Sequence, residues 1–123
     1  HFLGWRNDLE AILGELDVVI CCSKNEGTPV ALIEAMAAGV PVLSAEVGGV
    51  GDLIRQGETG WLAPPGDPPA LSRTIRDLLA DPERRARPLP AARRLALEKH
   101  NVKELLHRME ALYTSVLMVK KSQ

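Results

Sequence analysis

Residues 17–39 have the sequence DVVICCSKNEGTPVALIEAMAAG, and this segment decides the fold. It opens with a mainly β-branched apolar run at 17–22, which is typical of a parallel strand covered on both faces. A polar loop follows, and Thr28 and Pro29 then predict a helix start, with Thr28 as N-cap and Pro29 at the first helical position. Gly39 is expected to end the helix as a left-handed C-cap. The segment therefore predicts a strand–loop–helix unit.

The same alternation continues on both sides of this unit. Further strands are expected at residues 2–3, 40–44 and 61–63. Helices are expected from Asn7 or Asp8 to Leu16, from Gly48-Gly49 through Ile54, after Asp67, and from about Asn101 to Val116, with breaks at Pro88 and Pro90. This order predicts βαβ units and a parallel sheet. The fold class expected is α/β, a partial Rossmann-like doubly wound parallel sheet with C-terminal helices. The chain, 1–123, is expected to be a single partial domain, with βα units over about 1–80 and helices over about 81–123.

The charge of the chain is nearly balanced, with 15 basic and 16 acidic residues. No broad electrostatic field therefore draws it to nucleic acid, and no nucleic-acid partner is expected. Basic residues do gather in the later half, at Arg84, Arg85, Arg87, Arg93, Arg94 and Lys99. We interpret them as a solvated helix face, while contact with a partner domain or peripheral contact with a membrane-facing acceptor stays open.

Cys21 and Cys22 are the two cysteines of the chain, and they are adjacent. Neighbouring strand residues point to opposite faces, so a bridge between them would be strained. They are expected to be small core residues of a reduced, cytoplasmic protein. The sequence has no apolar run as long as a membrane span and no signal-peptide pattern.

The helix predicted after Pro29 carries one polar residue, Glu34, among apolar ones. A helix that is apolar all round is expected to be buried, and a buried carboxylate needs donors from an Arg or backbone amides, or a ligand. Glu26 lies in the loop ahead of this helix, and the free N–H groups of Val30 and Ala31 form a potential phosphate site. Two carboxylates that bracket such a helix start favour a ligand with both phosphate and hydroxyl groups, such as a nucleotide sugar.

The segments 22–29 and 32–42 resemble the E-x7-E signature of the retaining GT-B glycosyltransferases of family GT4. The resemblance extends over roughly the first 80 residues. It includes residues 2–4, 17–20, Gly48-Gly49, Ile54 with Gly57, 59–62 and 65–67. It implies that the chain is the later half of a GT-B C-terminal domain, which binds the donor of a retaining transferase.

The resemblance also implies roles for particular residues. Glu26 matches the catalytic acid that contacts the donor sugar and helps to hold the developing oxocarbenium charge, and Glu34 matches the acid that binds the ribose diol. The backbone amides of Gly27 and Thr28 would face the sugar, and those of Val30 and Ala31 the diphosphate. Trp5 and Arg6 are weaker candidates for contact with the base, and for Trp5 packing on the surface is favoured over stacking on the base. The transferred sugar is expected to be of hexose type, and no cofactor or metal is needed, since the donor phosphate can accept the acceptor's proton.

The chain departs from the family pattern in two ways. Val50-Gly51-Asp52 stands where the family usually has a pair such as Pro-Glu, and Pro88 and Pro90 interrupt a helix that is normally continuous. The chain opens at His1 without Met, so we expect it to begin partway through a larger protein. The acceptor domain and the basic pair that clamps the diphosphate would then precede it. We therefore expect little activity from the chain alone, and an unpaired edge at strand 17–22 that a second copy or swapped segment covers.

Two other functions remain open from the sequence. One is an epimerase or phosphorylase that shares the architecture. The other is a non-catalytic nucleotide- or phosphate-binding module, or an interaction fragment, which would tolerate Glu26→Ala and Glu34→Ala without a change in ligand affinity.

Overall fold

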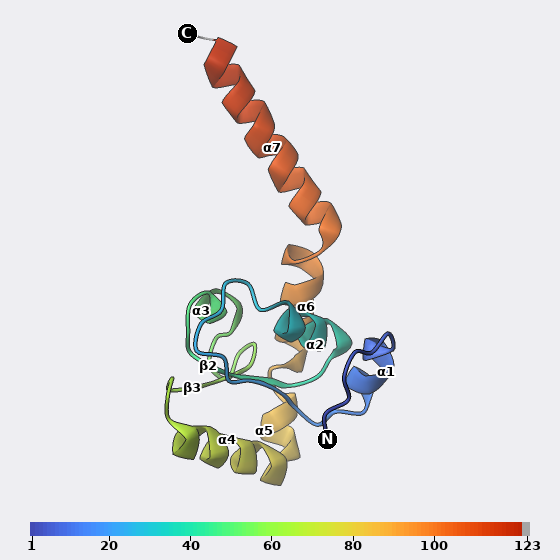
Figure 1. Cartoon of the computed structure of the whole chain (residues 1–123), viewed down its shortest axis with the longest axis vertical. Coiled ribbons are helices and arrows are strands. Elements are labelled where there is room, and N and C mark those ends of the chain that lie inside the picture. The colour runs from blue at the N-terminus through green and yellow to red at the C-terminus, as the bar shows by residue number, and fades with distance from the viewer. Residues whose placement is uncertain (122–123) are drawn as a thin grey trace.

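The computed structural model describes residues 1–121, with side chains described to Met118, and a three-stranded parallel sheet lies at its centre (Figure 1). The strands lie in sequence order and are β1 (Val19–Cys21), β2 (Val42–Ala45) and β3 (Trp61–Ala63). The helices are α1 (Leu9–Gly14), α2 (Val30–Ala38), α3 (Val50–Leu53), α4 (Pro68–Ala80), α5 (Pro82–Ala86), α6 (Leu89–Lys99) and α7 (Val102–Lys121). The predicted α/β class with a parallel sheet is therefore confirmed.

Side chains alternate along β2, so the central strand builds a core on both faces of the sheet. All four residues of β2 are buried. Val42 packs in the cluster that α2, α3 and α6 form, which includes Leu32, Met36, Leu53 and Ala96. Leu43 packs on the other face with Trp61 and Leu78. Figure 1 shows this division, with α2, α3 and α6 on one side of the sheet and α4 and α5 on the other.

The outer strands differ from the sequence prediction. Phe2 and Leu3 form no strand and lie exposed, because no strand among the described residues runs beside them to pair with their backbone. β1 lies at an edge of the sheet, as expected. Ile20 is 38% exposed, so the expectation that this strand is covered on both faces is wrong. Coverage of the edge by a second copy stays a prediction.

The helix ends follow the local sequence with one shift. The N-cap of α2 is Pro29 rather than Thr28, without a side-chain cap bond, and the Pro29 carbonyl accepts from the Leu32 N–H at 3.0 Å. Gly39 ends α2 in the left-handed conformation, with φ of 80°, as predicted. Asp67 caps α4 by accepting from the Ala70 N–H at 2.9 Å, also as predicted.

The basic segment before α6 is more than the solvated face that the sequence favoured. The Arg84 guanidinium lies 5.0 Å from the centre of the buried Trp61 ring, and that of Arg87 lies 5.9 Å from it. Both distances are within the range of a cation–π contact. Arg85 forms an ion pair with Asp17 at 3.2 Å. These contacts tie α5 to the sheet, which the sequence did not predict.

The cysteine prediction is confirmed in one part and wrong in another. Cys21 and Cys22 are both free, so they form no bridge. Cys21 is partly buried, but Cys22 is exposed and is not a core residue. Cys22 follows the last residue of β1 and lies outside the strand.

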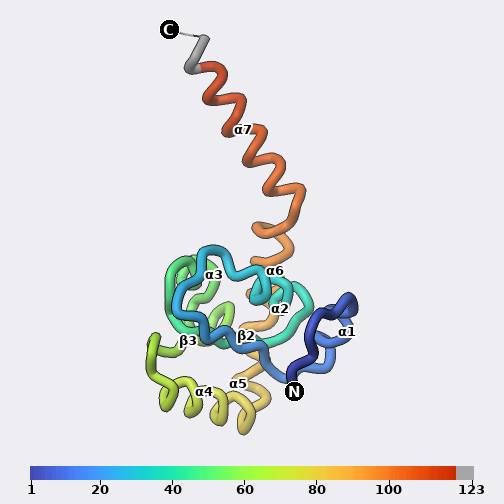
Figure 2. Tube along the Cα trace, in the orientation of Figure 1, coloured from blue at the N-terminus to red at the C-terminus, as the bar shows by residue number. Residues whose placement is uncertain are grey.

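Helix α7 is 20 residues long and extends away from the rest of the molecule, as the path of the chain shows (Figure 2). The sequence predicts that it is amphipathic, and its large apolar side chains up to Met118 are exposed; Leu105, Leu112 and Tyr113 each expose more than half of their surface. Among residues 1–121, no helix is both long and apolar enough to cross a membrane.

Leu78 and Leu79 offer a matched test of this packing, because they are neighbours on α4 with 0% and 48% exposure. We expect Leu78→Ala to lower the free energy of unfolding by about 2–5 kcal/mol through the cavity it leaves. Leu79→Ala should cost less than about 1 kcal/mol. Urea unfolding of the chain measures both, and equal losses would contradict the assignment of the core.

Candidate functional site

The loop from residue 23 to Pro29 leaves the carboxyl end of β1 and leads into α2. In open α/β sheets, ligands bind at this edge of the sheet. Glu26 lies in this loop and is partly buried. Its Oε1 lies 3.5 Å from the Sγ of Cys21, the last residue of β1. The loop therefore holds its acid next to the end of the sheet.

The Gly48–Gly49 pair lies directly on this loop. The Gly49 N–H donates to the Glu26 carbonyl at 2.9 Å. A Cβ at Gly48 would lie 2.0 Å from the Glu26 carbonyl oxygen, and one at Gly49 would lie 2.0 Å from that of Gly27. Both distances are shorter than any real Cβ contact, so only glycine allows this approach. The sequence predicts that this pair opens a helix, and two glycines just after a strand also signal close approach of another backbone.

The start of α2 presents backbone donors. The N–H groups of Val30 and Ala31 make no hydrogen bond within the part of the chain that the structure describes, and both residues are exposed. Gly27 and Thr28, which precede them, are exposed as well. Free N–H groups at a helix start favour a bound anion such as phosphate. The sequence predicted these donors, and the structure leaves them accessible.

Glu34 is exposed, so the predicted burial of this carboxylate is wrong. α2 buries Leu32, Ala35 and Met36 but exposes the face that carries Val30, Ala31 and Glu34. The apolar composition of α2 did not show that one of its faces stays uncovered. Glu34 therefore needs no compensating donor inside the protein, and its carboxylate is free to accept hydrogen bonds from a ligand.

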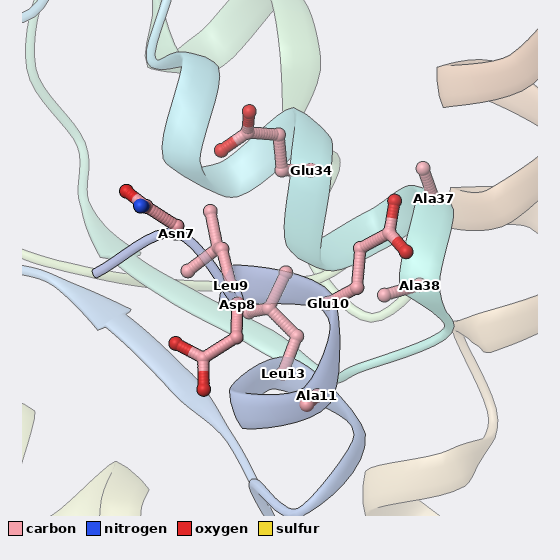
Figure 3. Close-up of a pocket in the computed structure, with 9 residues that line it drawn as sticks. All are labelled: Asn7, Asp8, Leu9, Glu10, Ala11, Leu13, Glu34, Ala37 and Ala38. Atoms are coloured by element: carbon pink, nitrogen blue, oxygen red, sulfur yellow. The ribbon is translucent and has the colours of Figure 1, made fainter.

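A pocket of about 780 Å³ lies between α1 and α2 (Figure 3). Glu34 lies across it from Asn7 and Leu9. The pocket is lined by Asn7, Asp8, Leu9, Glu10, Ala11, Leu13, Glu34, Ala37 and Ala38. Glu10 and Glu34 supply carboxylates that take part in no ion pair among the described residues, and such groups accept hydrogen bonds from hydroxyl groups and repel anions. The pocket therefore suits the hydroxyl-bearing part of a ligand rather than its phosphates.

Arg6 and Trp5 lie just ahead of the pocket residues. Arg6 binds both carboxylate oxygens of Asp8, with Nε 2.8 Å from Oδ1. This hydrogen bond holds the pKa of Asp8 below its usual value. The same bond explains why Asp8 stands at the N-cap of α1 without making a side-chain cap bond. Trp5 is 93% exposed and donates from Nε1 to the Asn7 Oδ1 at 3.1 Å, so the alternative that its ring packs on the surface is wrong.

The predicted site residues fall into two neighbouring groups. Glu26, Gly27, Thr28, Val30 and Ala31 share the loop and the helix start. Glu34 is one turn further along α2 and faces the pocket at α1, whose lining does not include Glu26.

Sequence reasoning missed Asn7 and Asp8 as pocket residues, since it considered them only as caps. It also missed the Cys21 contact with Glu26, for which the sequence has no clear signal. The described His, Cys, Asp and Glu side chains form no group of three that could hold a metal ion, and the expectation that no metal is needed stays a prediction.

The chain is similar to known proteins over most of its length. Residues 1–95 match the profile of the family described as glycosyl transferases group 1. The chain is 31% identical over 116 residues to the N-acetyl-alpha-D-glucosaminyl L-malate synthase of Bacillus anthracis, a match that covers 94% of this chain and 30% of that protein. It is 44% identical over 79 residues to the D-inositol 3-phosphate glycosyltransferase of Streptomyces avermitilis, covering 64% of this chain and 17% of that protein.

A solved structure shows the same likeness in three dimensions. HepE of Anabaena, in complex with UDP and glucose, matches with a TM-score of 0.88 and 28% sequence identity. The match covers 94% of this chain and 32% of the HepE chain. The chain thus spans about a third or less of the length of these three proteins.

The backbone contact at the loop can be tested with Gly49→Ala. Gly49 has φ of −77°, which alanine adopts freely, so its only obstacle is the clash with Gly27. We expect a loss of about 1–3 kcal/mol in the free energy of unfolding, with displacement of the Glu26 loop. The control is Gly51→Ala in α3, where a Cβ meets no atom within 4 Å. It should be neutral or stabilise by up to about 1 kcal/mol. Urea unfolding and amide NMR shifts measure both, and an unchanged loop in Gly49→Ala would contradict the contact.

Proposed function

The chain belongs to the glycosyl transferases group 1 family and corresponds to the C-terminal domain region of a GT-B glycosyltransferase, and on that premise we propose that it binds the nucleotide-sugar donor of a retaining transferase. The protein of which it forms part would transfer a hexose-type sugar to an acceptor. The observation that carries the proposal is the arrangement at α2. Accessible N–H groups of Val30 and Ala31 lie between a carboxylate in the loop, Glu26, and one on the exposed face, Glu34.

The helix start accounts for the diphosphate. A diphosphate carries two negative charges or more, and the N-terminal end of a helix carries unpaired donors and a positive partial charge. The amides of Val30 and Ala31 are exposed and unbonded among the described residues. α2 is nine residues long, so the peptide dipoles of more than two turns are aligned behind these donors.

Glu34 accounts for the ribose. It lies one turn beyond the free amides and lines the pocket at α1. A carboxylate can accept two hydrogen bonds from a vicinal diol. The carboxylate of Glu10 beside Glu34, unpaired in the part of the chain that the structure describes, makes the pocket unfavourable for phosphate, which separates the two parts of the nucleotide along α2. Trp5, whose ring is exposed, and Arg6 stand near this pocket as candidates for contact with the base.

Glu26 accounts for the sugar. It precedes the free amides in the chain, while Glu34 follows them, so a donor that places its ribose at Glu34 and its diphosphate at the helix start directs its sugar toward Glu26. The amides of Gly27 and Thr28, both exposed, lie beside it. A carboxylate at this place binds sugar hydroxyls and stabilises positive charge that develops at the anomeric carbon. The likeness to HepE, which was solved with UDP and glucose, supports the assignment.

Calorimetric titration of the chain with UDP, GDP and their glucose conjugates tests the proposal. We expect the chain to prefer one base. Glu34→Ala should lower the affinity for that nucleotide by about 10- to 100-fold, because two hydrogen bonds to a charged group are lost.

Glu83→Ala is the matched control, since Glu83 is an exposed carboxylate on α5, on the opposite side of the sheet. The nucleotide affinity of the Glu83→Ala chain should equal that of the unmodified chain. Nucleotide affinity that is the same in Glu34→Ala and in the unmodified chain would refute the ribose contact and favour a non-catalytic module.

A further inference from the structure

We propose that Cys21 is a positioning residue for Glu26, whose carboxylate its thiol holds by a hydrogen bond. The Sγ of Cys21 lies 3.5 Å from the Glu26 Oε1, and both side chains are partly buried. The inference rests on the function proposed above for Glu26 as the acid that faces the donor sugar. Cys21 itself would not touch the substrate, and it would act by fixing the direction of the carboxylate.

The thiol has one proton and two oxygen atoms within reach. The Ser23 Oγ also lies 3.5 Å from the Sγ of Cys21. A carboxylate is an acceptor only, and hydrogen bonds to a charged acceptor are stronger than those to a neutral hydroxyl. The thiol proton is therefore directed to Glu26, and the Ser23 hydroxyl can donate to the sulfur. The three side chains then form a short series of hydrogen bonds that ends on the carboxylate.

Glu26 has few other restraints on its side chain. Its backbone carbonyl is held by the Gly49 N–H, but this bond leaves the side chain free to rotate. The carboxylate takes part in no ion pair within the described residues. Cys21, in contrast, is fixed by the sheet, since it pairs with Ser44 of β2. The thiol therefore connects a side chain that has no ion pair in the described part of the chain to a strand of the sheet.

Cys22 provides a matched control, because it is adjacent, chemically identical and exposed. No hydrogen bond joins it to Glu26 among the described residues. Loss of this thiol should therefore leave both the Glu26 carboxylate and donor binding unchanged.

Infrared spectroscopy tests the hydrogen bond directly. In a Cys22→Ala chain, the remaining S–H stretching band belongs to Cys21, and a thiol that donates a hydrogen bond absorbs at lower frequency than a free one. We expect Glu26→Ala to move this band to higher frequency and Ser23→Ala to move it less. The proposal would be overturned if the frequency of this band did not change in Glu26→Ala, or if it changed only in Ser23→Ala.

Donor binding tests the positioning role. We expect Cys21→Ala to lower the affinity for UDP-glucose by about 2- to 10-fold in calorimetry. The affinity for UDP alone should not change, since Glu26 faces the sugar. Cys21→Ser, which keeps a donor, should restore part of the affinity. In a Glu26→Ala background, which removes the acceptor, Cys21→Ala should have no further effect, because the two residues act as a unit.

The outcomes separate this inference from the proposed function. If Glu26→Ala binds UDP-glucose normally, the role of Glu26 fails and the positioning role fails with it. If Glu26→Ala weakens binding but the effect of Cys21→Ala adds to it, or if Cys21→Ala affects UDP and UDP-glucose alike, only the positioning role is overturned.

Discussion

The backbone of Gly48 and Gly49 lies directly on the backbone of Glu26 and Gly27, and the candidate site depends on this contact. It joins the connection after β2 to the connection after β1, so two loops at the carboxyl edge of the sheet become one surface. A side chain at either glycine would push them apart. The strands position the ends of the loops, and this contact holds the backbone of Glu26 in place.

The surface that results has separate places for different chemical groups. Backbone donors at the start of α2 favour phosphate, and the carboxylates of Glu26 and Glu34 on either side favour hydroxyl groups. The pocket at α1 strengthens this division, since Glu10 adds negative charge near Glu34, while the charge of Asp8 is balanced by Arg6. A ligand with only one kind of group would use part of this surface. A ligand that is both phosphorylated and rich in hydroxyl groups would use all of it.

Local signals predicted the elements that carry the site. The apolar run of β1, the left-handed Gly39 and the Asp67 cap depend on neighbouring residues, and the sequence revealed them. Phe2 and Leu3 were wrongly expected to form a strand, because a strand needs a partner that local sequence cannot show. Burial of Glu34 was wrongly expected because an apolar helix does not reveal which face stays uncovered. The contact of Gly49 with Gly27 and the cation–π contacts of Trp61 join distant segments, and no local pattern encodes them.

The most direct test of the central claim is to map the binding of UDP-glucose to the chain by amide NMR shifts. The account predicts that saturable shifts concentrate at Gly27, Val30, Ala31 and Glu34, with smaller ones at Gly49 through its contact with the loop. Shifts confined to another surface, such as the polar groove between α3 and α6 that contains Arg55 and Arg94, would contradict it, as would a folded chain that shows no shifts at high ligand concentration.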